Sequence, residues 1–411
     1  MERVVITGMG AITPVGNDVP SFWESLKTGK CGIGPITKFD VSDFKVKLGA
    51  EVKDFDPTQY MEKREARRAD ANVHYAMAAA VQAVEQAGLK EGNFDPYRTG
   101  VIFGSGVGGL HIAEQEVPKL LEKGPGRVSP FAIPEMIANI AAAYISMHFG
   151  FKGENFCPVS ACATGNHSIG EAMRAIRHGY QDVVVCGGTE NGIIPISMAG
   201  FQNMKAVHMG EDPTAASIPF DARRSGFVMG EGGAILVLEE LEHARARGAQ
   251  ILGEITGYGA TCDAYHITAP DPAGAWSAAC MEQALADAGT APEAVDYINA
   301  HGTSTPLNDS GETAAIRKVF GGHADRLMVS STKSMTGHLL GASGAVEAVF
   351  CVLALKDSFV PATIHYQVPD PACDLDIVPN EGRQADIHCA LSDSLGFGGH
   401  NTCLVFQKWE G

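Results

Sequence analysis

Short runs of apolar and β-branched residues that end near glycine recur along this chain and alternate with alanine-rich stretches. Examples are RVVITGM at Arg3–Met9, VIFG at Val101–Gly104 and DVVVC at Asp182–Cys186. These runs lack polar alternation, which is typical of strands buried on both faces. Between them, Asp70–Gln86 has helical spacing and stops at Ala87-Gly88. Strand, glycine turn, helix and strand in this order predict βαβ units and an α/β fold.

The second part of the chain repeats this pattern. Further strands are expected over Gly233–Leu238, Gln250–Tyr258, Val295–Ala300, Met328–Ser331, Ile387–Leu391 and Thr402–Gln407, and helices over Phe22–Thr28, Ala275–Ala288 and 344–356. AVQAVEQAGL near Ala80 and MEQALADAGT at Met281–Thr290 both read as helices that end in Ala-Gly and precede a strand. This weak repeat favours two similar α/β halves, 1–250 and 251–411. No low-complexity linker separates them, so we expect them to pack together.

Charge and composition exclude several classes of protein. The 411 residues hold 31 Lys and Arg against 48 Asp and Glu, a net charge of −17, which argues against general nucleic-acid binding. The start lacks the pattern of a signal peptide, and no apolar run is long enough to cross a membrane. The ten cysteines are scattered without a CxxC pair, so we expect reduced thiols in a cytoplasmic protein.

The segment PVSACATG contains the cysteine best placed for chemistry, Cys162. The residues after it have apolar spacing at Ile169, Met173 and Ile176, which predicts that Cys162 lies at a helix N-terminus. Free N–H groups and the helix dipole at such a position lower the pKa of a thiol and favour the thiolate. The small neighbours of Cys162 leave room for a bulky acyl group. The alternative at this point is one more buried structural cysteine.

Two histidines follow predicted strands in the same way. His301 begins HGTSTP after one strand, and His338 ends STKSMTGH after another. In α/β folds the functional sites lie at the carboxyl ends of strands. A single histidine is more often structural, but one cysteine and two histidines at such ends predict a common site. The glycines of LGFGGHN permit backbone shapes that point an N–H group at an oxyanion.

Taken together, seven motifs span the chain: VVITGMGAITPVGN, GSGVGG, SACATG, FDARRSGFVMGEGG, NAHGTSTP, SSTKSMTGHLLGASG and GFGGHN. In this combination the chain resembles the elongating β-ketoacyl-[acyl carrier protein] synthases, of the type called synthase II. The resemblance implies the thiolase-like fold, in which two similar halves pack as five layers, α-β-α-β-α. It also implies a homodimer, an acyl carrier protein as partner and no cofactor.

The resemblance further implies the reaction and the roles of several residues. The reaction would be a decarboxylating Claisen condensation that extends an acyl chain, held on Cys162, by two carbons from a malonyl thioester. His301 and His338 would stabilise the enolate, Lys333 would support them, and Phe397 would gate the pocket. The remaining substrate-binding positions would be Val107, Ala132, Met136, Thr268, Thr303 and Thr305. Ala132 and Met136 would reach the acyl tunnel from the dimer partner.

Two further sites are expected. The carrier is acidic, as is this chain, so docking needs a local basic patch. The densest basic segment is KREARR, in which Arg64, Arg67 and Arg68 would share one helix face, and Arg127 is a further candidate from its loop in the family. By resemblance, a monovalent cation would be held by Asn299, Glu347, Ser392 and Asp393. A hydrogen-bond network without a metal is the alternative for these four residues.

Some positions depart from the family pattern, and other functions stay open. Leu395 replaces a phenylalanine, Asp393 an asparagine, and Ser225 stands where an aspartate is frequent. A thiolase would need a second cysteine in the glycine-rich turn, which this chain lacks. An inactive chain-length subunit of a polyketide synthase would lack the nucleophilic cysteine. A ketosynthase of a polyketide or other specialised pathway is the alternative that the sequence leaves open.

Overall fold

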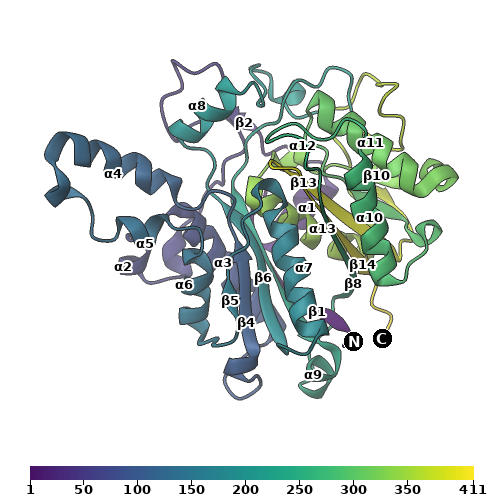
Figure 1. Ribbon diagram of the computed structural model, residues 1–411, viewed down its shortest axis with the longest axis horizontal. Coiled ribbons are helices and arrows are strands. Elements are labelled where there is room, and N and C mark those ends of the chain that lie inside the picture. Colours follow the sequence, from purple (N-terminus) through teal and green to yellow (C-terminus); the bar gives the residue numbers. More distant parts are fainter.

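The β-branched runs form the strands of one ten-stranded sheet in the computed structural model, which describes residues 1–411 (Figure 1). The strand order is β10-β9-β13-β14-β8-β1-β7-β6-β4-β5. The strands of the first half are β1 (Val4–Ile12), β4 (Thr99–Gly104), β5 (Asn155–Phe156), β6 (Val183–Glu190) and β7 (Gly232–Glu240). Those of the second half are β8 (Gly253–Cys262), β9 (Tyr297–Asn299), β10 (Met328–Ser330), β13 (Cys389–Gly396) and β14 (His400–Gln407).

The two halves of this sheet repeat one topology. The order β5-β4-β6-β7-β1 matches β10-β9-β13-β14-β8 strand for strand. In each set the first two pairings are parallel and the last two antiparallel. The sets join where β1 pairs with β8 over three residue pairs, from Val4↔Ile255 to Ile6↔Gly253. The chain therefore contains two equivalent α/β units, and their division at residue 250 remains a prediction.

Helices cover both sets of strands and fill the space between them. They are α3 (Ala71–Ala87) and α6 (Ile140–Phe149), α7 (Thr164–Arg177) and α13 (Ser343–Asp357), and α10 (Ala275–Ala288) and α11 (Pro306–Phe320). The α3–α6 pair packs on the outer face of the first set, and α10, with α11 against it, on that of the second. Between the sets lie α7 and α13, each in contact with strands of both (Figure 1). The predicted five layers are confirmed.

The central layer is the core of the molecule. Residues 343–355 of α13 are all buried, because the helix is apolar around its whole circumference and has a sheet on either side. The largest core cluster joins Ile6 and Ile169 of the first half to Val349 and Leu404 of the second. The two halves therefore share one core.

The remaining helices connect these layers. They are α1 (Val19–Lys27), α2 (Lys63–Ala66), α4 (Leu110–Lys123), α5 (Ala132–Met136), α8 (Pro195–Asn203), α9 (Leu241–Ala246) and α12 (Lys333–Thr336). Two strand pairs, β2 (Gly34–Pro35) with β3 (Leu48–Gly49) and β11 (Phe359–Val360) with β12 (Arg383–Gln384), form small separate sheets. Helix α4 projects from the body of the molecule (Figure 1). None of the helices combines the length and apolar character needed to cross a membrane.

Candidate active site

Cys162 lies in a tight turn at the start of the central helix α7. A 3₁₀ turn over Ala161–Ala163 leads directly into this helix, and Ala161 has a positive φ of 50°. The neighbouring hairpin approaches so closely that a Cβ at Gly396 would lie 2.7 Å from the carbonyl oxygen of Ser160. The cysteine is therefore held between the end of β13 and the N-terminus of α7, and only its place at a helix N-terminus was predicted from the sequence.

The electrostatic setting of Cys162 differs from the expectation. The side chain is largely buried, and this burial raises the pKa of the Cys162 thiol to about 12. The nearby ammonium of Lys333 acts in the opposite direction, and the carboxylate of Glu190 adds to the increase. The predicted lowering of the pKa at the helix N-terminus is therefore wrong. Loss of solvent outweighs the positive charges around the sulfur, so the resting form is the thiol.

His301 and His338 face each other beside this turn. Their ring centroids are 5.3 Å apart and the rings are nearly perpendicular. The loop of His301 is fixed by Glu312, which accepts hydrogen bonds from the N–H groups of His301 and Gly302 at 2.6 and 2.8 Å. Burial lowers the pKa of both imidazoles well below the usual range, and the charge of Lys333 lowers them further. Both histidines are therefore neutral at pH 7.

The partners of the two imidazoles also determine their tautomers. Lys333 Nζ lies 3.5 Å from Nδ1 of His301 and donates toward it. Ser343 Oγ lies 2.9 Å from Nδ1 of His338 and already accepts the N–H of Leu339, which leaves its own hydrogen for the ring. With both Nδ1 atoms acting as acceptors, each neutral ring carries its hydrogen on Nε2. Two N–H donors are thus available to a ligand.

Lys333 is buried together with its counter-ion. Its Nζ forms an ion pair with Oε1 of Glu347, and both side chains are almost completely inaccessible to solvent. Burial raises the pKa of Glu347 to about 7, although Lys333 acts against this increase. Since Nζ contacts Glu347 on one side and His301 on the other, Lys333 is fixed in place and cannot reach into the pocket as a free base.

A pocket connects these groups to the surface. Cys162, His301, His338 and Phe397 all line it, and so do three of the predicted substrate-binding residues, Thr268, Thr303 and Thr305. The hydroxyl oxygens of Thr303 and Thr305 lie 2.9 Å apart. Several other residues that line the pocket are not among the predicted ones: Phe201, Phe227, Asp263, Asn308 and Leu340. Phe227 could have been found, because it belongs to the motif FDARRSGFVMGEGG; its ring packs edge-on against His338 at 5.2 Å.

The other three predicted substrate-binding residues lie outside this pocket. Val107 is 44% exposed on the loop after β4, where its N–H donates to Glu190 at 3.3 Å. The same carboxylate accepts the N–H groups of Gly106 and Gly341. Ala132 is buried and Met136 half-buried, at the two ends of α5. The roles of Val107, Ala132 and Met136 remain predictions.

Only two of the four arginines in the predicted basic patch line the same cavity. Helix α2 ends at Ala66, so the expectation that Arg64, Arg67 and Arg68 share a helix face is wrong: the last two lie in the turn beyond it. Arg64 and Arg68 line one cavity, and the guanidinium of Arg68 stacks 4.5 Å above the ring of Phe131. Arg67 and Arg127 are exposed and lie outside that cavity.

The four residues predicted to hold a cation share an unusual property. Buried oxygen atoms without any hydrogen-bond partner occur in all of them, namely Asn299 Oδ1, Glu347 Oε2, Ser392 Oγ and both carboxylate oxygens of Asp393. Unpartnered buried oxygens are costly, and hard cations prefer oxygen ligands. The donor set therefore fits a cation of the alkali or alkaline-earth type.

Comparison with known proteins agrees with this geometry. The β-ketoacyl synthase N-terminal domain matches residues 1–244, and the C-terminal domain of the same family matches residues 252–367. The 3-oxoacyl-[acyl-carrier-protein] synthase 2 of Synechocystis sp. is 52% identical over 410 residues, which is 100% of this chain and 99% of that protein. The synthase 2 of Coxiella burnetii is 49% identical over 99% of both chains.

Solved structures with the same fold cover the chain equally well. A β-ketoacyl synthase from Burkholderia phymatum has a TM-score of 0.92 at 34% identity over 100% of both chains. The ketosynthase of a type II polyketide system, solved in complex with its acyl-carrier protein, has a TM-score of 0.91 at 33% identity and also covers both chains completely. The full-length match in sequence and in fold shows that this chain belongs to the β-ketoacyl synthase family.

Proposed function

We propose that this chain is a 3-oxoacyl-[acyl carrier protein] synthase that elongates fatty acyl chains, with Cys162 as nucleophile and His301 and His338 as hydrogen-bond donors to the second substrate. The observation that carries the proposal is that one buried thiol and two neutral imidazoles line one pocket. The names of relatives about 50% identical over the whole chain favour fatty acid elongation. The polyketide ketosynthase among the structural neighbours is less similar, at 33% identity.

The first half-reaction transfers the acyl group. The sulfur of Cys162 attacks the carbonyl of the acyl thioester, the bond from that carbonyl to the carrier sulfur breaks, and the acyl group is then held on Cys162. The proton of the Cys162 thiol ends on the departing carrier thiol. Since burial raises the pKa of Cys162 to about 12, this proton leaves in the course of the transfer and not before it.

The second half-reaction forms the carbon–carbon bond. The malonyl thioester loses CO₂, and the electron pair of the broken bond moves onto the thioester as an enolate, whose oxygen accepts hydrogen bonds from Nε2 of His301 and His338. Neutral donors suit this step, because a charged imidazolium would be costly to bury. The enolate carbon then attacks the acyl carbonyl. The resulting oxyanion is held by the N–H groups of Cys162 and Phe397, and its collapse releases the Cys162 thiolate.

The carrier protein is the proposed partner. The names of the curated relatives and the complex of the polyketide ketosynthase with its acyl-carrier protein support this. The net charge of −17 means that an acidic partner must dock on local positive charge. Arg64 and Arg68, which line one cavity, and the exposed Arg67 and Arg127 are the candidates to supply such charge. With no disulfide among its ten cysteines, the protein suits a reducing, cytoplasmic location.

We also propose a homodimer. Strand β5 is an exposed edge of the ten-stranded sheet, and an unpaired edge is normally covered. Exposed apolar side chains gather on nearby elements: Val117, Leu120 and Leu121 on α4, Ile133 on α5, and Ile137 and Val159 in the following segments. A second copy on this face would cover them. The loop of Val107 contacts the end of this chain's own α5, where the N–H of Gly109 donates to the carbonyl of Met136 at 2.9 Å, and the approach of the partner's α5 remains a prediction.

The cation is part of the proposal as well. Asn299, Glu347, Ser392 and Asp393 would hold it, and its charge would compensate buried carboxylates beside Lys333. Potassium or sodium in place of a bulky organic cation such as tetramethylammonium should therefore raise the thermal unfolding temperature. Asp393→Leu, which removes two ligand oxygens, should abolish this difference between the salts. An unfolding temperature that is independent of the cation would contradict the site.

The separation of the two half-reactions tests the proposed roles. His301→Ala and His338→Ala should still form the acyl-Cys162 adduct, detected by intact mass, but release CO₂ from malonyl carrier protein about 10²–10³-fold more slowly. Cys162→Ala should form no adduct. His148→Ala, an exposed histidine on α6, serves as the matched control. Decarboxylation at the wild-type rate in either His301 or His338 variant would show that its assigned role is wrong.

A further inference from the structure

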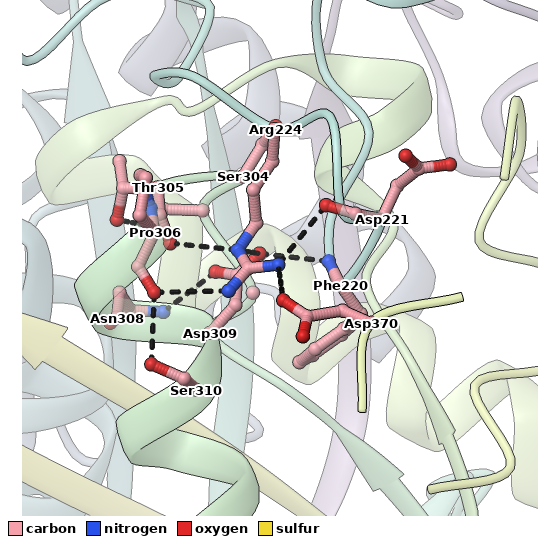
Figure 2. A network of polar contacts seen from close by, with 12 residues as sticks. Phe220, Asp221, Arg224, Ser304, Thr305, Pro306, Asn308, Asp309, Ser310 and Asp370 are labelled. Carbon is pink, nitrogen blue, oxygen red and sulfur yellow. Dashed lines mark hydrogen bonds and ion pairs between the residues drawn. The ribbon is translucent and has the colours of Figure 1, made fainter. Parts of the chain in front are cut away.

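A buried arginine behind the pocket joins three separate segments of the chain. Arg224 lies in the segment between Phe220 and Gly226, and its side chain is only 5% exposed. Its guanidinium donates to the carbonyl oxygens of Thr305, Pro306 and Asp221 at 3.3, 3.1 and 3.0 Å. It also forms an ion pair of 2.5 Å with Asp370 (Figure 2). The N–H groups of the guanidinium therefore donate to several partners at the same time.

The same segments are joined by a second set of contacts. Ser304 has a positive φ of 67°, and its hydroxyl accepts the N–H of Ile218 at 3.0 Å while its carbonyl accepts the N–H of Gly226 at 3.0 Å. Asp309 accepts the N–H of Phe220 at 2.8 Å and lies 3.7 Å from the guanidinium. A left-handed serine is strained and persists only where its surroundings enforce it. These contacts therefore fix the conformation of the loop that follows His301.

The held loop carries two side chains of the pocket wall. Thr303 and Thr305 line the pocket, and their hydroxyls bond to each other but to no other group of the protein. Arg224 contacts the backbone of Thr305 and of the residue after it (Figure 2) and is not itself among the residues that line the pocket. Two paired hydroxyls at a fixed position offer hydrogen bonds to an extended polar ligand that passes between the surface and Cys162.

A role in stability alone explains this arrangement poorly. A buried arginine loses its hydration, and replacing buried ion pairs by apolar residues is often neutral for stability. Three contacts of Arg224 are to main-chain oxygens, those of Asp221, Thr305 and Pro306 at the start of α11, so its guanidinium determines where these segments lie.

We propose that Arg224 is a positioning residue for the thioester arm of the substrate, acting by holding the hydroxyls of Thr303 and Thr305 at the pocket wall. The inference rests on the proposed substrate-binding role of these two threonines. The arm is common to carrier-protein and coenzyme A thioesters, so the effect is independent of protein docking. It concerns binding of the arm and not the reacting atoms at Cys162.

Steady-state kinetics of Arg224→Lys and Arg224→Met test the proposal. KM should rise on the order of tenfold for both carrier-protein and coenzyme A thioesters, with kcat nearly unchanged. Turnover of N-acetylcysteamine thioesters, which contain only the end of the arm, should be unaffected. Arg247→Met is the matched control, because Arg247 is a buried arginine paired with Glu239 and with the carbonyl of Ala87, outside the pocket. It should leave KM unchanged.

Alternative variants of Arg224 and a double threonine variant complete the test. If Arg224→Met does not fold, Arg224→Lys and rescue of Arg224→Ala by millimolar methylguanidinium provide the same readout. Thr303→Val with Thr305→Val should reproduce the rise in KM; no rise there would refute the role of the threonines themselves. A rise in the threonine variant without one in the Arg224 variants would refute positioning by Arg224. An equal loss with all three classes of thioester, or a fall in kcat at constant KM, would also overturn the proposal.

Discussion

Burial sets the chemistry of the individual residues in this pocket. Burial holds Cys162, His301 and His338 in their neutral forms; the charge of Lys333 opposes this effect at Cys162 and adds to it at both histidines. A neutral thiol is a poor target for oxidants and alkylating reagents. The pocket therefore contains a thiol that reacts slowly with such reagents and two hydrogen-bond donors that need no change of protonation to bind a substrate.

The rate at which iodoacetamide modifies Cys162 should follow this raised pKa. Because only the thiolate reacts and the pKa is about 12, the rate should increase about tenfold per pH unit from pH 6 to pH 9 without a plateau. Peptide mapping by mass spectrometry measures the modification at Cys162. The exposed Cys262, in the same samples, serves as the internal control for the reagent. A plateau below pH 8 would show that the thiolate is already stabilised in the empty site.

Residue identities could be predicted here, but their electrostatics could not. The motifs that contain Cys162, His301, His338 and Lys333 are short and continuous in the sequence. The identities of these residues could therefore be predicted from the sequence alone. The pKa of Cys162 depends instead on how much solvent the folded chain removes from it, including the pocket walls formed by Phe227 and Leu340. The unpartnered oxygens of Asp393 likewise become visible only in the folded chain.

At the scale of elements, close contact between β4 and α7 determines where Cys162 lies. Gly104 ends β4, and a Cβ there would lie 2.2 Å from Thr164 Cγ2 and 2.7 Å from the carbonyl oxygen of Pro158. The first turn of α7 therefore rests directly on the strand. Any side chain at Gly104 must push this turn, and Cys162 with it, away from the sheet.

Gly104→Ala should consequently destabilise the protein by on the order of 1–3 kcal/mol, as overpacking of a core does, and reduce acyl-Cys162 formation. Urea unfolding and the intact-mass assay measure the two effects. Gly200→Ala is the control: Gly200 lies in helix α8 with no atom within 4 Å of its Cβ position, so alanine there should be neutral or stabilising. Equal stability of the Gly104 and Gly200 variants would contradict the proposed contact.

Elements were predictable where their signals are local. Helix α10 spans Ala275–Ala288, as its spacing and the following glycine predict. Strand β6 continues through Gly187, which the sequence suggests is a turn; a Cβ there would lie 2.1 Å from Ala234 O, so this glycine permits close strand packing. Short elements such as α2 depend on tertiary contacts, and Arg67 and Arg68 therefore fell outside the predicted helix.

At the scale of the whole molecule, charge reversal tests carrier docking. Arg64→Glu with Arg67→Glu should raise KM for acyl carrier-protein substrates and leave coenzyme A thioesters nearly unaffected, because only the protein partner senses the surface charge. Arg68 is less suitable, since it also packs on Phe131. The control is Lys356→Glu, an exposed lysine near the end of α13 distant from the pocket. An equal loss with both substrates would argue against docking at α2.

Substitutions of exposed apolar side chains on α4 test the proposed homodimer. In light scattering after size exclusion, the wild type should have about twice the 43.3 kDa of one chain. Leu120→Glu with Leu121→Glu should shift it toward the monomer, because Leu121 is 78% exposed on the projecting helix α4. Tyr180→Glu places the same charge at an exposed residue beyond the far end of α7 and should leave the dimer intact. A monomeric wild type would refute the proposed interface.

The central helix α13 has a consequence for how the protein is made. Its residues 343–357 leave the ribosome about a hundred residues after β7 is complete at Glu240. At a synthesis rate of about 5–20 residues per second, roughly 5 to 20 s pass before α13 is made. During this time only α7 covers the inner face of the first set of strands. Nascent chains of this length therefore expose a broad apolar surface until synthesis reaches the helix.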